Sequence, residues 1–119
     1  MLIRVRNETR GTIVATAAEV ADTGRKRRVG LLKKEKLERG EGLWITPCES
    51  VHTFFMKFAI DLVYLDGKRR VRKVRHAVPP WRISGCFAAH SVLELPAGAV
   101  AASSTQRGDQ LLFETVATT

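Results

Sequence analysis

The sequence contains only two cysteines and no long hydrophobic run. Cys48 and Cys86 are too few for a disulfide framework, so we expect free thiols, with one bond between them as the open alternative. No segment approaches the roughly 20 apolar residues of a membrane-spanning helix. Residues 1–6 lack the apolar core of a secretory signal. These absences predict a soluble, cytoplasmic chain without a membrane span.

Acidic residues are also scarce, with 12 against 20 basic ones, a net charge of +8 and a pI near 10.2. One basic block spans residues 25–39, and a second spans residues 68–82 and contains no acid. Such blocks are most often solvated faces, but they attract anionic partners, including phosphate backbones, weakly and without specificity. Aromatic residues make up only 7% of the chain and no glycine-rich phosphate cradle is present, so specific nucleic-acid readout is not predicted.

Short β-forming segments separated by turn residues dominate what remains. At 119 residues the chain suits one domain over 1–119, with residues 116–119 frayed. We predict a mainly β fold, a compact antiparallel sandwich or barrel with one short helix over 25–36 capped by Thr23. The predicted strands cover residues 2–6, 12–16, 43–46, 61–65, 69–76, 91–95 and 109–115.

Three of these strands carry more detailed expectations. The run Leu62–Leu65 predicts burial on both faces, and Asp66-Gly67 predicts a two-residue hairpin turn. In the returning strand, Val71 and Val74 are three residues apart, so either the strand contains a β-bulge or one of these valines faces solvent. Alternation places Glu94 on the same face as Val92, where it either points to solvent or needs a buried partner.

The segment from Pro47 to Gly67 concentrates the groups that could carry chemistry. Cys48 and His52 could serve as nucleophile and base, or as a buried thiol and a hydrogen-bonded histidine. With Cys86, His76 and His90 they form an incomplete zinc-ligand set, so no metal or other cofactor is predicted. We expect Lys57 to pair with Asp61, either as part of a site or to fix the loop.

Two further positions could line a pocket. Trp81 and Arg82 follow two prolines and could stack on a sugar or base, or could cap the end of a barrel. Glu94 would become a site carboxylate if it pointed inward. The ligand-binding candidates are His52, Thr53, Phe55, Lys57, Asp61, Trp81, Arg82 and Glu94.

Several segments of the chain, taken in order, resemble the domain-of-unknown-function family 192, over roughly residues 4–113. They are Arg28–Leu32, Gly42–Cys48 with Val51–Lys57 and Ile60–Asp61, Pro80–Arg82, and Val92–Gly98 followed by Gly108–Asp109. Family patterns usually read Arg-Phe-Pro-Ile-Asp where this chain has Lys57-Phe58-Ala59-Ile60-Asp61, which removes a rigid turn and a bidentate fork. The resemblance implies a jelly-roll-like β-domain and no established activity; some relatives look secreted.

Three functional hypotheses follow. The leading one is a non-enzymatic binding or accessory domain with a cleft for an anionic or hydroxyl-rich small ligand. The second is an enzyme that uses Cys48 or His52 and requires the two to lie within hydrogen-bond reach in an open pocket. The third is a basic protein that interacts with nucleic acid or an acidic partner and requires both basic blocks on one face.

Overall fold

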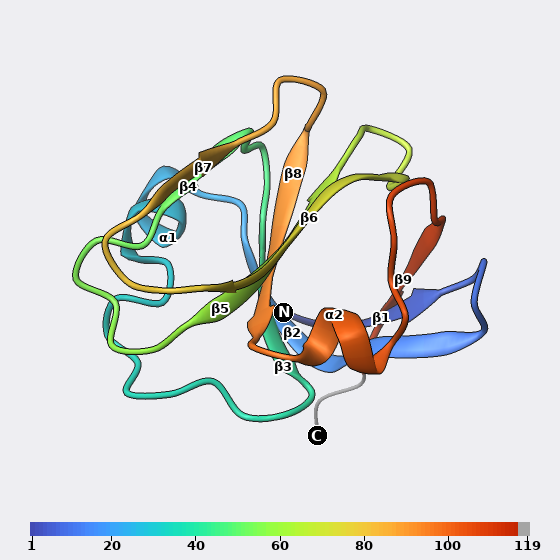
Figure 1. Cartoon of the computed structure of the whole chain (residues 1–119), viewed down its shortest axis with the longest axis horizontal. Coiled ribbons are helices and arrows are strands. Elements are labelled where there is room, and N and C mark those ends of the chain that lie inside the picture. Colours follow the sequence, from blue (N-terminus) through green and yellow to red (C-terminus); the bar gives the residue numbers. More distant parts are fainter. Residues whose placement is uncertain (117–119) are drawn as a thin grey trace.

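The computed structural model describes residues 1–116 as a mainly β structure with two short helices (Figure 1). The elements in chain order are β1 (Leu2–Asn7), β2 (Thr12–Ala21), α1 (Gly24–Val29), β3 (Glu41–Ile45), β4 (Ser50–His52), β5 (Ile60–Leu65), β6 (Val71–Val78), β7 (Ile83–Gly85), β8 (Ser91–Pro96), α2 (Ala99–Ala102) and β9 (Leu111–Thr115). Of the residues expected to fray, Val116 donates a backbone hydrogen bond to Leu2 at 3.0 Å, and 117–119 lie outside the described residues.

Seven strands form one curled sheet in the order β6-β5-β8-β3-β2-β1-β9, and β4 pairs with β7 in a separate two-stranded sheet. The curled sheet is a half-barrel, which confirms the predicted mainly β, barrel-like class. It departs from purely antiparallel order at β2 and β3, which run parallel. Residues 22–40, including α1, carry the chain back across the sheet, as a parallel connection requires.

The two edge strands of the half-barrel come together through the turns that flank them. Arg70 and Gln110 form an isolated antiparallel bridge. The Val71 amide donates to the Asp109 carbonyl at 2.8 Å, and the Leu111 amide donates to the Arg69 carbonyl at 3.1 Å. These bonds bring the β6 end of the sheet to its β9 end, so part of each edge is covered rather than exposed to other chains.

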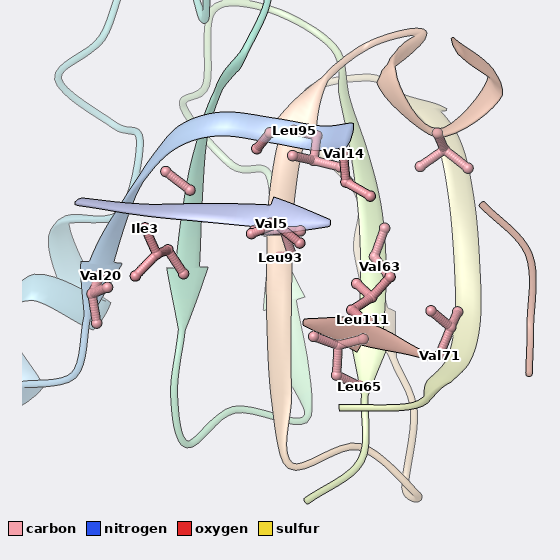
Figure 2. Close-up of a cluster of buried hydrophobic side chains, with 13 residues drawn as sticks. Ile3, Val5, Val14, Val20, Val63, Leu65, Val71, Leu93, Leu95 and Leu111 are labelled. Atoms are coloured by element: carbon pink, nitrogen blue, oxygen red, sulfur yellow. The ribbon is translucent and has the colours of Figure 1, made fainter. Parts of the chain in front are cut away.

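The sheet has hydrophobic clusters on both faces. Inside the curl, side chains such as Val5, Val63, Leu93 and Leu111 converge (Figure 2). On the outer face of the central strands a second cluster includes Leu43, Leu62, Tyr64 and Val92, with Leu31 and Met56 from the connections. Every residue of β5 is buried, which confirms the prediction that this strand is covered on both faces.

Local turn chemistry explains where the strands and helices end. α1 begins after Thr23, whose hydroxyl accepts from the Lys26 amide at 3.2 Å, as predicted. It ends at Val29, seven residues before the predicted end at Lys36, because Gly30 takes φ 49° and ψ −128°, which ends the helix.

The β5–β6 connection is longer than the two-residue turn that was predicted. The Asp66 carboxylate accepts from the amides of Lys68 and Arg70, at 2.9 and 3.0 Å, and Arg69 has φ 62°. These side-chain bonds favour a wider turn over the tight Asp-Gly hairpin. Tyr64 of β5 pairs with Lys73 of β6, while the next residue, Leu65, pairs with Val71. One residue of β6 is therefore extra at this point, which confirms the β-bulge.

Candidate functional site

A pocket of about 600 Å³ lies between α1, the connection that follows β3, and β4. Figure 1 shows these elements, with β7, gathered at one side of the molecule. The helical side contributes Arg27, Arg28 and the segment that follows them, and the opposite side contributes Cys48 and His52. The complete lining is Gly24, Arg27 to Leu32, Ile45, Pro47, Cys48, Ser50 to His52, Met56 and Glu94.

Glu94 is the buried acid of this pocket. It lies in the middle of β8, opposite Leu43 of β3 and Leu62 of β5, and only 4% of it is exposed. It shares the Val92 face, as predicted, and that face is covered by the pocket walls instead of being open to solvent. Within residues 1–116 its carboxyl makes no hydrogen bond and no ion pair, although a buried acid normally has one.

Burial raises the pKa of Glu94 from 4.5 to about 7. The charged form loses its hydration in the pocket and gains no compensating bond there. Near neutral pH the carboxyl is therefore present in both forms, and it can either donate or accept a hydrogen bond to a group that enters the pocket.

Cys48 and His52 line the same pocket without forming a catalytic pair. The Cys48 thiol donates to the Ser50 carbonyl at 3.1 Å, while His52 Nδ1 accepts from the Phe54 amide at 3.3 Å. Burial raises the pKa of Cys48, and the charge of Glu94 adds to this effect. The protonated thiol is thus favoured, which is the opposite of what a cysteine nucleophile needs.

The other cysteine and the possible metal ligands do not extend this chemistry. Cys48 and Cys86 are both free thiols. Residues 1–116 contain no group of three or more histidine, cysteine, aspartate or glutamate side chains arranged to hold a metal ion.

Arg27 and Arg28 were assigned by sequence to a solvated basic block, and the structure brings both to the pocket. Arg27 Nη1 lies 3.3 Å from the Asp22 carbonyl and 3.4 Å from the Thr46 carbonyl, so this side chain ties α1 to the opposite wall. Arg28 is exposed and leaves its guanidinium available at the rim. The segment Arg28–Leu32 is one of those that carry the family resemblance, and this resemblance was the signal in the sequence that could have pointed to the segment as part of the pocket.

Asp61 holds the fold together rather than pairing with Lys57, so the predicted ion pair is wrong. Asp61 is fully buried, and its oxygens accept from the backbone amides of Ala77 at 2.8 Å, Gly98 at 3.1 Å and Val100 at 2.9 Å. Lys57 lies on the surface and pairs with Glu35. These three backbone donors stabilise the buried carboxylate of Asp61 without an ion pair to a lysine.

Thr53 has a similar bridging position between loops. Its side chain is buried and donates to the Pro79 carbonyl at 2.7 Å, while it accepts from the Arg82 amide at 2.9 Å. Arg82 itself is exposed and lies against the carbonyls of Pro80 and Trp81. Neither side chain lines the pocket.

Phe55 and Trp81 lie outside the pocket in a row of aromatic rings that starts at His52. The ring centroids are 4.9 Å apart for His52 and Phe54, 5.7 Å for Phe54 and Trp81, and 4.8 Å for Phe55 and Trp81. Of the eight predicted ligand-binding residues, the structure brings only His52 and Glu94 into one pocket.

The curled seven-stranded sheet with two short helices places this chain among small β-domains of the half-barrel type. The chain belongs to the family described as uncharacterized ACR, domain of unknown function 192, whose model matches residues 5–113. This confirms the resemblance seen in the sequence. The family description states no activity.

Curated relatives of this chain carry names that state no activity. A UPF0127 protein of Thermococcus sibiricus is 31% identical over 116 residues, covering 91% of this chain and 73% of that protein. A UPF0127 protein of Pyrococcus horikoshii is 32% identical over 115 residues, covering 92% and 97%. Both names record a family without an assigned function.

Two solved structures share the fold. One, described as a putative transcription regulator from Sinorhizobium meliloti, has a TM-score of 0.82 and 19% identity, and the match covers 94% of this chain and 92% of that one. The other, a protein of unknown function from Novosphingobium aromaticivorans, has a TM-score of 0.80 and 18% identity, covering 94% and 84%. At these identities the likeness establishes the fold alone.

Proposed function

We propose that this chain is a small-ligand-binding domain without catalytic activity and that its ligand occupies the Glu94 pocket. The observation that carries the proposal is Glu94, a residue with only 4% of its surface exposed, which lines the pocket and whose carboxyl has no hydrogen-bond or ion-pair partner within residues 1–116. A buried acid without a partner destabilises a fold, so its presence in a pocket wall favours a role in binding. The protonated thiol of Cys48, and its hydrogen bond to Ser50 instead of His52, disfavour a catalytic role.

The lining indicates what such a ligand would contain. A hydroxyl group would exchange hydrogen bonds with Glu94 in either protonation state. An anionic group would lie against the guanidinium of Arg28 at the rim, where a bidentate contact is possible. Apolar surface from Ile45 and Met56 would cover the body of the molecule. Together these groups support a hydroxyl-rich ligand with an anionic substituent, such as a sugar phosphate or a hydroxycarboxylic acid.

The test is titration calorimetry of the wild type and of Glu94→Gln with a panel of sugar phosphates, polyols and hydroxycarboxylic acids. Glutamine keeps the shape of the side chain but cannot ionise, so it loses the charge-assisted hydrogen bond that the carboxylate would accept from a ligand hydroxyl, and we expect binding to weaken about tenfold. Glu19→Gln, at an exposed position of β2, is the matched control and should bind as the wild type does. Backbone amide shifts on binding should cluster at residues 27–32 and 48–52.

Two outcomes would overturn the proposal. One is that Glu94→Gln binds every active compound as tightly as the wild type. The other is that amide shifts on binding avoid both walls of the pocket. A second variant, Arg28→Gln, separates the two parts of the ligand, since it should weaken binding of anionic compounds and leave neutral polyols unaffected.

A further inference from the structure

The β4–β7 sheet and the residues that flank it carry large apolar side chains that no other element of residues 1–116 covers. In and around β7, Trp81 is 56% exposed, Ile83 72% and Phe87 100%. Between them, Ser84 is buried, which fixes the inner face of the strand. Side chains of this size and exposure are unusual on a surface unless something binds them.

The strand alongside extends the same surface. His52 of β4 lies opposite Ile83, and Ser50 lies opposite Gly85. Beyond His52, the rings of Phe54 and Phe55 pack against Trp81. Phe55 is itself 69% exposed, so the apolar surface continues past the end of the sheet. We call this surface, formed by Phe54, Phe55, Trp81, Ile83 and Phe87, the aromatic face.

Positive charge borders the aromatic face. Arg82 is exposed, and its guanidinium lies 3.4 Å from the carbonyl of its neighbour Trp81, so it places a cation at this face. Lys73 and Arg75 of β6 contact β7 from its inner side, where Lys73 lies over the buried Tyr64 ring and Arg75 lies 3.5 Å from the Ser84 hydroxyl. The nearby acid is Glu49, whose carbonyl accepts from the Cys86 amide. The whole chain carries a net charge of +8, which adds to the attraction for anionic groups.

We propose that the aromatic face docks on an anionic lipid surface. Protruding aromatic and aliphatic side chains enter the interfacial layer of a bilayer, and cations beside them bind acidic headgroups. A short peptide instead needs a groove for its own side chains, and Trp81, Ile83 and Phe87 do not line the pockets beside α1, β2 or the start of β1. A second copy of this chain is opposed by repulsion between two strongly basic molecules.

This mode of binding requires no membrane-spanning segment. Within residues 1–116 no helix is long and apolar enough to cross a bilayer. The interaction is therefore peripheral, and two weak contributions, apolar insertion and charge attraction, must act together. It is also independent of the Glu94 pocket, because none of the five residues of the aromatic face lines that pocket.

The experiment is co-sedimentation of the full chain with vesicles of phosphatidylcholine alone and of phosphatidylcholine with phosphatidylglycerol in equal parts. The wild type should sediment with the mixed vesicles only, and added salt should release it. Tryptophan emission should shift to the blue on binding as Trp81 leaves water, since Trp44 already packs against Phe113 inside the protein.

The apolar contribution is tested with Ile83→Ser combined with Phe87→Ser. Both side chains are exposed, so the variant should fold as the wild type does and bind the mixed vesicles at least about tenfold more weakly. Ile13→Ser is the matched control, because Ile13 is 45% exposed on β2, away from the aromatic face, and this variant should bind normally.

The electrostatic contribution is tested with Arg82→Gln, which removes the exposed cation beside Trp81 and should weaken binding of the mixed vesicles about fivefold. Lys33→Gln removes the same net charge from an exposed position elsewhere and should have a much smaller effect.

The proposal is overturned if the wild type does not sediment with the mixed vesicles, or if the Ile83/Phe87 variant sediments with them as the wild type does. It is also overturned in favour of nucleic acid if the wild type binds a single-stranded oligothymidylate instead of vesicles and the same variant abolishes that binding. Failure of either kind leaves the Glu94 pocket untouched, since Glu94→Gln should bind vesicles normally.

Discussion

At the scale of single residues, Glu94 shows how one buried carboxyl can be costly for folding and useful for binding. It occupies a central strand where its neighbours on the same face are apolar. The free energy that the fold loses by burying this acid is the part that a ligand with a hydroxyl group could restore. The same residue therefore links stability, pH and ligand binding.

Glu94→Gln should change how stability depends on pH. The pKa of Glu94 is about 7 in the folded chain against 4.5 as its ordinary value, so the folded state binds the proton more tightly than the unfolded state. The contribution of this group to the free energy of unfolding is fully present below pH 4.5 and is lost as pH rises to 7. Its full size is on the order of 3 kcal/mol.

Urea denaturation of both proteins at about pH 5 and about pH 8 measures this contribution as a difference. The wild type should lose stability relative to Glu94→Gln between the two pH values, and the glutamine variant should be the more stable protein at the higher one. Other carboxylates titrate equally in both proteins and cancel. Parallel profiles for the two proteins would contradict the prediction.

Sequence reasoning reached the correct strand face for Glu94 but not its surroundings. Alternation with Val92 follows from β geometry alone. Whether that face meets solvent depends on α1 and β4, which cover it from distant parts of the chain. Asp61 shows the same limit, because its partners are backbone amides of Ala77, Gly98 and Val100, and no residue type in the sequence identifies them.

At the scale of elements, α1 forms one wall of the pocket, and the helix is stabilised mainly by the residues at its two ends. It has six residues, none of them buried, so tertiary packing of its own side chains contributes little. The chain is anchored after the helix by Leu31, which is buried in the outer cluster. Three cations in its last turn, Lys26, Arg27 and Arg28, interact favourably with the helix dipole.

Thr23→Ala should loosen this wall by removing the cap. The Thr23 hydroxyl is the side-chain acceptor for the Lys26 amide, and losing such a cap costs about 1 kcal/mol. Hydrogen exchange should report the change locally, as faster exchange of the Arg27 and Gly30 amides, whose acceptors are the carbonyls of Thr23 and Lys26. Thr23→Ser keeps the hydroxyl and should exchange as the wild type does. Equal rates in the alanine and serine variants would show that the cap does not hold the helix.

The element boundaries show where a local pattern is informative and where it misleads. The cap at Thr23 and the bulge in β6 both follow from residues within one segment, and both were predicted. The helix was predicted to be too long because Val29 and Leu32 have helical spacing, although Gly30 lies between them. Periodicity indicates which residues share one face, whereas Gly30, with a positive φ that glycine adopts readily, ends the helix.

At the scale of the whole molecule, the half-barrel depends on contacts between residues far apart in sequence, 102 positions in the case of Asn7 and Asp109. Its edges meet through Arg70 and Gln110, and the first strand reaches the loop before β9 through Asn7. Residue pairs separated by such distances leave no local pattern. The mainly β class could therefore be predicted from the sequence, whereas the parallel β2–β3 pair and the closure of the sheet could not.

Asp109 is the residue on which this closure depends most. One of its carboxylate oxygens accepts from Asn7 Nδ2 at 2.9 Å, from Arg10 Nε at 3.1 Å and from the Gln106 amide at 2.9 Å. The backbone carbonyl of Asp109 accepts from the Val71 amide, so the same residue joins β1, β6 and the start of β9. Asn7 is itself buried, and without the carboxylate its Nδ2 would keep only the longer contact with Thr105.

Asp109→Ala should therefore destabilise the fold by about 3 kcal/mol, because it leaves the buried amide of Asn7 without its main acceptor and removes a bond to a charged group. The measurement is the urea midpoint together with hydrogen exchange of the Val71 and Leu111 amides, which bridge the two sheet edges and should exchange faster than amides in β5. Asp22→Ala removes an exposed acid of the same charge and should leave both readouts unchanged. An unchanged midpoint in Asp109→Ala would mean that the curl of the sheet is held by its hydrophobic interior alone, and that the hydrogen bonds across its edges follow from the fold instead of stabilising it.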